Sequence, residues 1–349
     1  MIGTHLETMG GISSVVNVYR AAGLFARWPI TYIATHCDGS GLDKLGALFR
    51  GFVQFMVLLL SGRIKLVHAH VSSRASFWRK SLFLLPAMVL SIPVVLHLHG
   101  SEFAIFFEKE CGDCRKALVR FVFNRASRVV VLSAAWKQWV QGMCTNPHVL
   151  TIYNPALLPR QSTEWSCRKA YTVLCLGRLG KRKGSYDLLD AVAQLTNKHP
   201  HVKLLLGGDG EIEQVRVRAA DLGISDHVHL LGWVRGEGKD RYLRSATIYA
   251  LPSHNEGLPM SVLEAMAASL PIVSTSVGGI PEAVSSGTEG YLVEPGDIPS
   301  LVACLDRLLS EEGLAERMGV AARCKVEATF SAQAILPQVE AIYRELGAA

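Results

Sequence analysis

Two glutamates with seven residues between them are the residues of this chain best placed to do chemistry. Glu256 follows an apolar run, residues 246–251, which predicts a buried strand. Glu264 falls in a predicted helix that starts at Pro259, a residue favoured at the first helical position, and stops at Pro271. The free N–H groups at the start of that helix make the loop an anion site. Two carboxylates beside an anion site suit a ligand with hydroxyls and phosphates, such as a nucleotide sugar.

A basic loop follows another predicted strand, residues 171–176. It contains Arg178 and Lys183, and two cations there can neutralise a diphosphate as its negative charge grows on departure. The neighbouring Lys181 and Arg182 are alternatives to Lys183. The competing interpretation of both loops is an ordinary strand-loop-helix unit with charged surface residues.

Polar residues also follow several predicted strands of the first half of the chain. Strands and helices alternate throughout, which predicts parallel sheets whose ligands bind beyond the carboxyl ends of the strands. The polar residues at such ends are His70, His99, Ser133 and Asn154. A regular strand turns residues two apart to the same side, so His97 and His99 point differently only if the strand ends between them. On that basis we favour His99 over His97.

A pair of glycines, Gly10 and Gly11, precedes an apolar-periodic segment and predicts a turn that opens a helix. Glycine lets the backbone approach a ligand closely and leaves the N–H groups of the helix start free for a phosphate. The sequence therefore predicts a ligand-facing turn near the start of the chain.

Taken together, these stretches resemble a known enzyme family. The motifs Glu256-Gly-Leu-Pro…Glu264, Gly177-Arg-Leu…Lys-Gly and His99-Gly are similar to those of the retaining glycosyltransferases of family four (glycosyl transferases group 1). The resemblance covers nearly the whole chain and is densest over residues 154–295.

The resemblance implies an α/β architecture called GT-B, in which two Rossmann-like doubly wound domains face each other across a cleft. We expect an acceptor-side domain over residues 1–163 and a nucleotide-sugar domain over residues 164–330. We expect the final helix, residues 331–349, to cross back onto the first domain.

The resemblance also implies roles for the donor residues. Glu264 would accept hydrogen bonds from the ribose hydroxyls, and Glu256, with the backbone N–H groups near Gly257 and Leu258, would hold the sugar. Asp209 lies in a glycine-rich loop similar to one that lines the family's donor site. Arg178 and Lys183 would stabilise the leaving diphosphate.

On the acceptor side, the resemblance places His99 against the donor sugar and close to the acceptor. The turn at Gly10 and Gly11 would face the donor diphosphate and the acceptor, and Asn154 would line the same rim. The front-face mechanism usually described for the family needs no covalent carboxylate nucleophile, because the departing phosphate takes the acceptor's proton.

The expected function is transfer of a hexose-type sugar from a nucleotide diphospho-sugar to a glycan or lipid-linked acceptor, in cell-surface polysaccharide biosynthesis. The alternatives are a nucleotide-sugar epimerase or a phosphorylase of the same fold, and a non-catalytic relative that binds a glycan or a nucleotide. The chain contains no Asp-x-Asp pair, so we expect neither a metal ion nor another cofactor. Its eight cysteines show no zinc spacing, and Cys111 and Cys114 are the only close pair.

Charge is distributed unevenly along the chain. Residues 1–150 hold 16 Lys and Arg against 7 Asp and Glu, whereas the remainder holds 20 against 23. A basic first half suits acidic lipid or a pyrophosphate-linked acceptor, and no aromatic-basic motif for nucleic acid is present. We expect a cytoplasmic protein, with possible peripheral contact at the inner face of the membrane. The apolar stretches 52–60 and 82–98 could press on a membrane surface, but we favour core packing for both.

The start of the chain is short for the expected fold. In the family, the glycine turn follows the first, central strand, yet only nine residues precede Gly10. Ile2 and Leu6 are the only aliphatic residues before Met9, whereas a buried parallel strand is a nearly continuous apolar run. We expect either a native start upstream of Met1 or a first sheet that lacks this strand.

Overall fold

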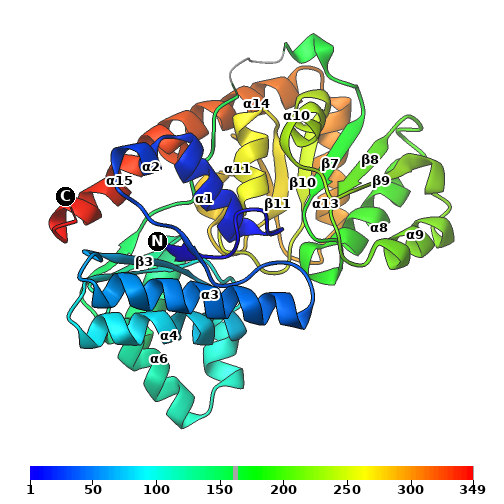
Figure 1. Ribbon diagram of the computed structural model, residues 1–349. Helices are drawn as coiled ribbons and strands as arrows, with labels where there is room; N and C mark the ends of the chain where they lie inside the picture. Colours follow the sequence, from blue (N-terminus) through cyan, green and yellow to red (C-terminus); the bar gives the residue numbers. More distant parts are fainter. Residues whose placement is uncertain (160–163, 349) are drawn as a thin grey trace. The chain divides into compact units, whose positions relative to one another are not determined.

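The computed structural model describes residues 1–159 and 164–348, and these form two compact units (Figure 1). Unit 1 comprises Met1–Pro155 and the C-terminal segment from Ala332, and unit 2 comprises Ala156–Ser331. Each unit contains a parallel sheet of six strands flanked by helices. The expected α/β fold class is confirmed. The expected boundary at residues 163/164 adjoins residues 160–163, which lie outside the described residues.

The sheet of unit 1 has the strand order β2-β1-β3-β4-β5-β6. The order reverses between β1 and β3, so the switch point of the topology lies there. The strands are β1 (Ile2–Gly3), β2 (Ile33–Ala34), β3 (Val67–Val71), β4 (Val94–Leu98), β5 (Arg128–Val131) and β6 (Val149–Thr151). The α-helices are α1 (Gly11–Ala21), α2 (Leu24–Arg27), α3 (Gly41–Leu60), α4 (Ala75–Val89), α5 (Phe103–Ile105), α6 (Asp113–Arg125), α7 (Ala134–Met143) and α15 (Ala332–Glu345).

The sheet of unit 2 has the order β12-β11-β10-β7-β8-β9, and its switch point lies between β7 and β10. The strands are β7 (Thr172–Leu176), β8 (Lys203–Gly207), β9 (Val228–Gly232), β10 (Ile248–Leu251), β11 (Ile272–Thr275) and β12 (Gly290–Val293). The α-helices are α8 (Ser185–Leu195), α9 (Ile212–Asp221), α10 (Gly236–Ser245), α11 (Met260–Ala267), α12 (Ile280–Ala283), α13 (Ile298–Ser310) and α14 (Leu314–Lys325).

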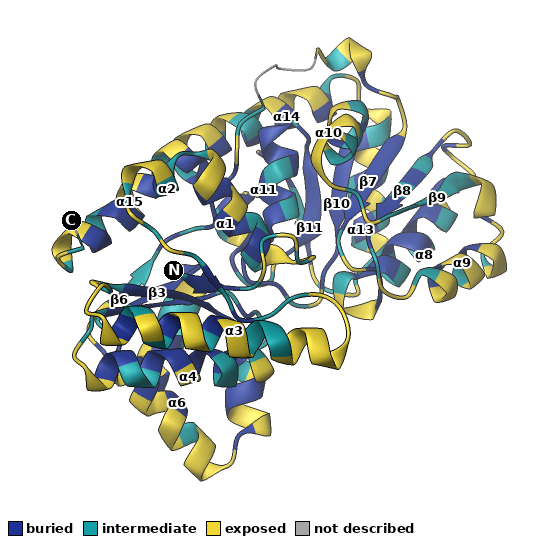
Figure 2. Ribbon diagram, in the orientation of Figure 1, coloured by how far each residue is buried: buried dark blue, intermediate teal, exposed yellow. Residues whose placement is uncertain are grey.

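The two faces of the unit 1 sheet carry different side chains. All five residues of β3 and all five of β4 are buried (Figure 2). Val67, Ala69 and Val71 join the apolar core that includes residues of α3 and α4. The intervening His68 and His70 point to the opposite face, because successive side chains of a strand alternate. On that face they meet Tyr343 of α15 and Tyr19 of α1.

A short strand stands where the sequence predicted a gap. β1 pairs with β2 on one side, through Ile2 with Ile33 and Gly3 with Ala34, and with β3 on the other, through Ile2 with Ala69. Ile2 is buried in the core. The first sheet therefore has a strand in this central position, and its pairing is limited to two residues.

The helix that carries Glu264 differs at both ends from the prediction. Pro259 is extended, with φ −71° and ψ 125°, and precedes the helix instead of forming its first turn. At the other end, α11 stops at Ala267, before Pro271 is reached. Ser269 has a φ of 58°, and a left-handed residue just past a helix end terminates it.

Candidate functional site

Lys183 and Glu256 form an ion pair at the switch point of unit 2. Lys183 comes from the loop after β7 and Glu256 from the loop after β10, and these strands are neighbours at the point where the strand order reverses. Their side chains are only 15% and 7% exposed. Ser253 also donates its hydroxyl to Glu256 Oε1, at 2.8 Å. The sequence predicted both charges, and the structure adds that they neutralise each other.

Hydroxyls on β11 hold the loop after β10 in place. The Ser274 hydroxyl donates to the Leu251 carbonyl at 2.6 Å, and the Thr275 hydroxyl donates to the Ser253 carbonyl at 2.5 Å. Both side chains are fully buried, so these hydrogen bonds are shielded from water. They fix the backbone from which Glu256 projects.

Glycines allow the loop around Glu256 to approach its neighbours closely. A Cβ at Gly278, which has a φ of 60°, would lie 2.1 Å from the Glu256 carbonyl oxygen. The next residue, Gly279, donates its N–H to the Gly257 carbonyl at 2.5 Å. Leu258 is buried just before the start of α11. The Glu256–Leu258 segment is thus braced by the loop that follows β11.

Glu264 lies on α11 and accepts a hydrogen bond from Lys239 of α10, with 2.7 Å between Nζ and Oε1. The two side chains are 25% and 20% exposed for Lys239 and Glu264 respectively. The sequence predicted Glu264 as a binding residue and missed Lys239. Nothing local in the sequence marks Lys239, since it is one of several charged residues in a polar helix.

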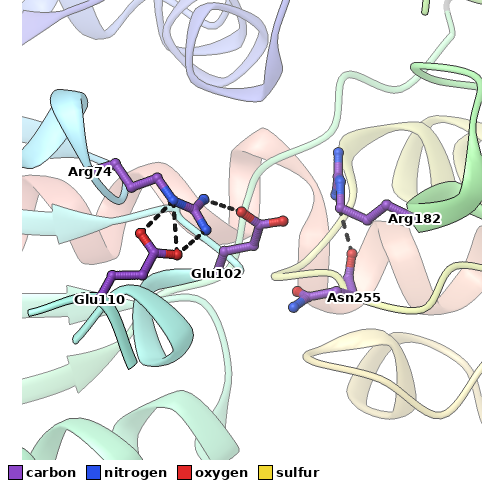
Figure 3. A network of polar contacts seen from close by, with 5 residues as sticks. All are labelled: Arg74, Glu102, Glu110, Arg182 and Asn255. Atoms are coloured by element: carbon purple, nitrogen blue, oxygen red, sulfur yellow. Dashed lines mark hydrogen bonds and ion pairs between the residues drawn. The ribbon is translucent and has the colours of Figure 1, made fainter. Parts of the chain in front are cut away.

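The remaining basic residues of the predicted diphosphate loop are more open. Arg178, Lys181 and Arg182 are exposed, whereas only 15% of the Lys183 side chain is exposed. Arg182 donates to the Asn255 carbonyl at 3.3 Å (Figure 3). Of the four, Lys183 is therefore the one that the fold directs to Glu256.

Asp209 contributes its backbone to the arrangement of the loops. Its carbonyl accepts the N–H of Leu179 at 2.7 Å, which joins the loops after β7 and β8. A Cβ at Gly208 would lie 1.8 Å from the Gly177 carbonyl oxygen, so the two loops touch through backbone alone. Asp209 therefore supports the loop that carries Arg178.

In unit 1, the structure brings together three of the predicted strand-end residues. His99 Nε2 lies 2.8 Å from His70 Nδ1, and the His99 ring also forms a hydrogen bond with Asn154. Burial, reinforced by the positive charge of Lys80, lowers the pKa of His99 to about 3, against the opposing effect of Asn154. His99 is therefore a neutral ring held on two sides.

A second pair of histidines lies beside the first. His68 Nε2 lies 3.1 Å from His97 Nδ1, and His68 Nδ1 lies 2.6 Å from the Tyr343 hydroxyl. Burial lowers the pKa of His68 to about 3 and the pKa of His97 well below its usual value. One nitrogen from each of His68, His70 and His97 lies within 4.8 Å of the others, a spacing near that of a metal site. Both nitrogens of His68, however, already have hydrogen-bonding partners.

Two other predicted positions in unit 1 have different surroundings. Gly10 precedes α1 and Gly11 is its first residue, and a Cβ on either would meet nothing within 4 Å, so this turn is open. Ser133 instead caps α7, because its hydroxyl oxygen accepts the Trp136 N–H at 3.1 Å. Ser133 follows the end of β5 as expected, and its hydroxyl oxygen is engaged as a helix cap.

The rim of unit 1 also carries an ion-pair cluster that the sequence did not predict. Arg74, in the loop after β3, bonds to both Glu102 and Glu110, with 2.8 Å between Arg74 Nε and Glu110 Oε2 (Figure 3). These hydrogen bonds raise the pKa of the Arg74 guanidinium further. Arg74 adopts a φ of 55°, unusual for a residue other than glycine. Arg74 is 28 residues from Glu102 and 36 from Glu110, so no local pattern connects it to them.

Two protein-family models match the chain: Glycosyltransferase Family 4 over residues 19–156 and Glycosyl transferases group 1 over residues 164–325. The chain belongs to this glycosyltransferase family. It is 26% identical to the alpha-D-kanosaminyltransferase of Streptomyces kanamyceticus over 302 residues, covering 80% of this chain and 77% of that protein. It is 36% identical to the D-inositol 3-phosphate glycosyltransferase of Corynebacterium jeikeium, covering 49% of this chain and 42% of that protein. The chain spans about half the length of several such relatives.

Solved structures show the same fold. Sucrose-phosphate synthase from Thermosynechococcus elongatus matches with a TM-score of 0.81 and 21% identity, covering 99% of this chain and 98% of that one. HepE from Anabaena, solved in complex with UDP-glucose, matches with a TM-score of 0.74 and 20% identity, covering 94% and 89%. Both are GT-B structures. This chain therefore has the fold that the sequence led us to expect.

Proposed function

We propose that this glycosyltransferase is a retaining enzyme that moves a hexose-type sugar from a nucleotide diphospho-sugar to a glycan or lipid-linked acceptor. The observation that supports it most is the buried pair of Lys183 and Glu256 at the switch point of unit 2. A donor diphosphate suits the ammonium of Lys183, and the hydroxyls of the sugar suit the carboxylate of Glu256. The pair thus supplies one group for each half of the donor.

Donor binding would exchange the partners of this pair. With the diphosphate beside Lys183, its ammonium turns to the phosphate oxygens, and Glu256 accepts hydrogen bonds from sugar hydroxyls. Exposed Arg178 adds a second cation to the diphosphate. Glu264, oriented by Lys239, accepts hydrogen bonds from the ribose. Neither buried charge is left alone in either state, which avoids the cost of an unpaired ion.

In the proposed reaction, the bond between the anomeric carbon and the diphosphate oxygen breaks, and the acceptor hydroxyl oxygen bonds to that carbon from the same face. The acceptor proton passes to the departing phosphate oxygen. Lys183 and Arg178 stabilise the growing negative charge. Glu256 orients the sugar and is not itself glycosylated, so no covalent enzyme intermediate forms.

On the acceptor side, neutral His99 and Asn154, together with the open turn at Gly10 and Gly11, would contact sugar hydroxyls. An amylovoran biosynthesis glycosyltransferase of Erwinia amylovora is 34% identical over 181 residues, covering 50% of this chain and 44% of that protein. This likeness supports a role in surface polysaccharide assembly. We place the enzyme in the cytoplasm, with peripheral contact at the membrane, and propose that the transfer needs no metal ion.

A panel of labelled nucleotide sugars, incubated with and without a lipid extract and with EDTA, tests the proposal. We expect transfer from one donor that survives EDTA, and NMR should show the product with the donor's anomeric configuration. An inverted product would overturn retention, and loss of activity in EDTA would overturn metal independence. Epimerised donor without transfer would favour an epimerase, and nucleotide binding without turnover would favour a non-catalytic relative.

A further inference from the structure

The outer face of α3 is apolar along its whole length. Leu42, Phe49 and Leu60 are 81%, 68% and 74% exposed, far more than a core helix normally leaves open. The exposed apolar residues recur every three or four positions, which places them on one side of the helix. This outer stripe consists of Leu42, Leu45, Phe49, Val53, Val57 and Leu60. Figure 2 shows exposed residues recurring along this helix.

The opposite side of α3 is fully engaged with the sheet. Phe55 and Leu59 are buried in the core of unit 1. Gly51 lies so close to β2 that a Cβ there would be 2.6 Å from the Ala34 carbonyl oxygen. The helix therefore cannot rotate its outer stripe inward without losing this packing. The stripe is a second apolar face, additional to the one that folding requires.

Neighbouring α4 extends the apolar surface. It packs beside α3 on the same side of the sheet (Figure 1). Leu82 and Val89, two turns apart on α4, are 50% and 81% exposed, and Leu90 follows the helix. None of the helices within the described residues has both the length and the apolarity to cross a bilayer.

The charges around the stripe are mostly positive, and Asp43 in the first turn of α3 is the one carboxylate on this helix. Residues 44–101, which include nearly all of α3 and the whole of α4, contain seven Lys and Arg and no Asp or Glu. Arg50 on α3 and Arg63 and Lys65 just after it are exposed. A second copy of the chain would bring these cations face to face across a symmetric contact, which is unfavourable. An anionic lipid surface meets both requirements, since it accepts apolar side chains and attracts cations.

We propose that the outer stripe of α3 docks this protein on an anionic membrane. At about 1.5 Å per residue, the helix presents a stripe roughly 30 Å long, which lies in the plane of the interface with its apolar side chains below the headgroups. Arg50 and Arg63 then lie at headgroup level. The proposal deepens the membrane contact in the proposed function and names the surface that makes it.

Vesicle flotation of the full chain tests the docking without any sugar transfer. The probes are vesicles of phosphatidylcholine alone and of an equal mixture with phosphatidylglycerol. We expect binding to the mixed vesicles that weakens as salt rises, and much weaker binding to phosphatidylcholine. The variant Leu45→Ser/Phe49→Ser should bind at least tenfold more weakly, and Arg50→Gln/Arg63→Gln about 25-fold more weakly, at roughly fivefold for each of the two cations.

Val217→Ser/Val320→Ser is the matched control, because both valines are exposed, at 58% and 53%, but lie in unit 2. It should float like the unaltered chain, and all variants should keep their melting temperature. Equal binding of all variants would overturn the proposal. The proposal would also be overturned if the unaltered chain sediments as a dimer and only Leu45→Ser/Phe49→Ser is a monomer. Transfer to a soluble acceptor is measured separately, so loss of transfer with intact flotation would contradict the proposed function and not the docking.

Discussion

The two units present opposite chemistry at the carboxyl ends of their strands. Unit 2 holds paired full charges, Lys183 with Glu256 and Lys239 with Glu264. Unit 1 holds four neighbouring imidazoles on β3, on β4 and just after β4, which burial keeps neutral. A charged rim can exchange partners with a diphosphate, whereas a neutral rim offers oriented polar groups without attracting an ion. The same sheet architecture thus supports two kinds of recognition.

The largest expected difference between the units is their response to acid. Burial holds the pKa of His68 at about 3 in the folded chain. The unfolded chain, with a histidine pKa of about 6.5, therefore takes up the proton first as the pH falls. Stability is complete above about pH 6.5 and declines below it, by about 2 kcal/mol for His68 alone at pH 5. His70 and His97 act in the same direction.

Hydrogen exchange measures this difference directly. The chain is equilibrated at pH values between about 7.5 and 5, pulse-labelled at one fixed pH and digested for mass spectrometry. Peptides of β3 and β4 should lose protection before peptides of β7 and β8. Loss of protection at the same pH in both units would contradict the role of the histidines. His68→Phe should shift the loss to lower pH if the variant folds.

The next largest effect concerns the ion pair of unit 2. Lys183→Met leaves the carboxylate of Glu256 buried and unpaired, so we expect a loss of about 3–5 kcal/mol in the free energy of unfolding. Adding Glu256→Gln should restore most of that stability but none of the transferase activity. Urea denaturation and a transfer assay measure the two properties. A single variant as stable as the unaltered chain would show that the pair is solvated.

Donor affinity gives an intermediate effect. Glu264→Ala should raise the donor KM by about 10- to 150-fold, because two ribose hydroxyls lose an acceptor at a cost of about 1.5–3 kcal/mol. Lys239→Met keeps the carboxylate and serves as the control, with a smaller increase. Initial rates at several donor concentrations give both values. Equal increases in the donor KM of the two variants would mean that Glu264 acts through its ion pair with Lys239 instead of touching the ribose.

The smallest effect concerns the contact between His70 and His99. An asparagine amide nitrogen can occupy the place of Nδ1, whereas a glutamine reaches the place of Nε2. His70→Asn should therefore keep the hydrogen bond to His99, and His70→Gln should lose it. We expect kcat/KM to fall about tenfold more in His70→Gln, as befits one hydrogen bond. Identical losses in both variants, at matched melting temperatures, would contradict this positioning role.

Local patterns in the sequence were sufficient for much of this protein. Short runs rich in valine, isoleucine or leucine that start just after a proline predicted strands such as β4 and β11. Because parallel strands deliver their carboxyl ends to one edge, the same patterns predicted that His99, Lys183 and Glu256 would lie at such edges. These features depend on residues that are adjacent in the chain, so they can be predicted from the sequence.

Other features depend on residues far apart in the chain, and only the tertiary structure decided them. Lys183 and Glu256 are 73 residues apart, and His68 and Tyr343 are 275 apart, so no local pattern predicts that they pair.

The outer stripe of α3 is a further case. Apolar residues on all sides of a segment indicate a buried helix, and the sequence favoured core packing for residues 52–60. The sheet covers only one side of α3, so Val53, Val57 and Leu60 remain exposed. Composition determined that this helix is apolar, and the placement of its neighbours determined which side meets the solvent.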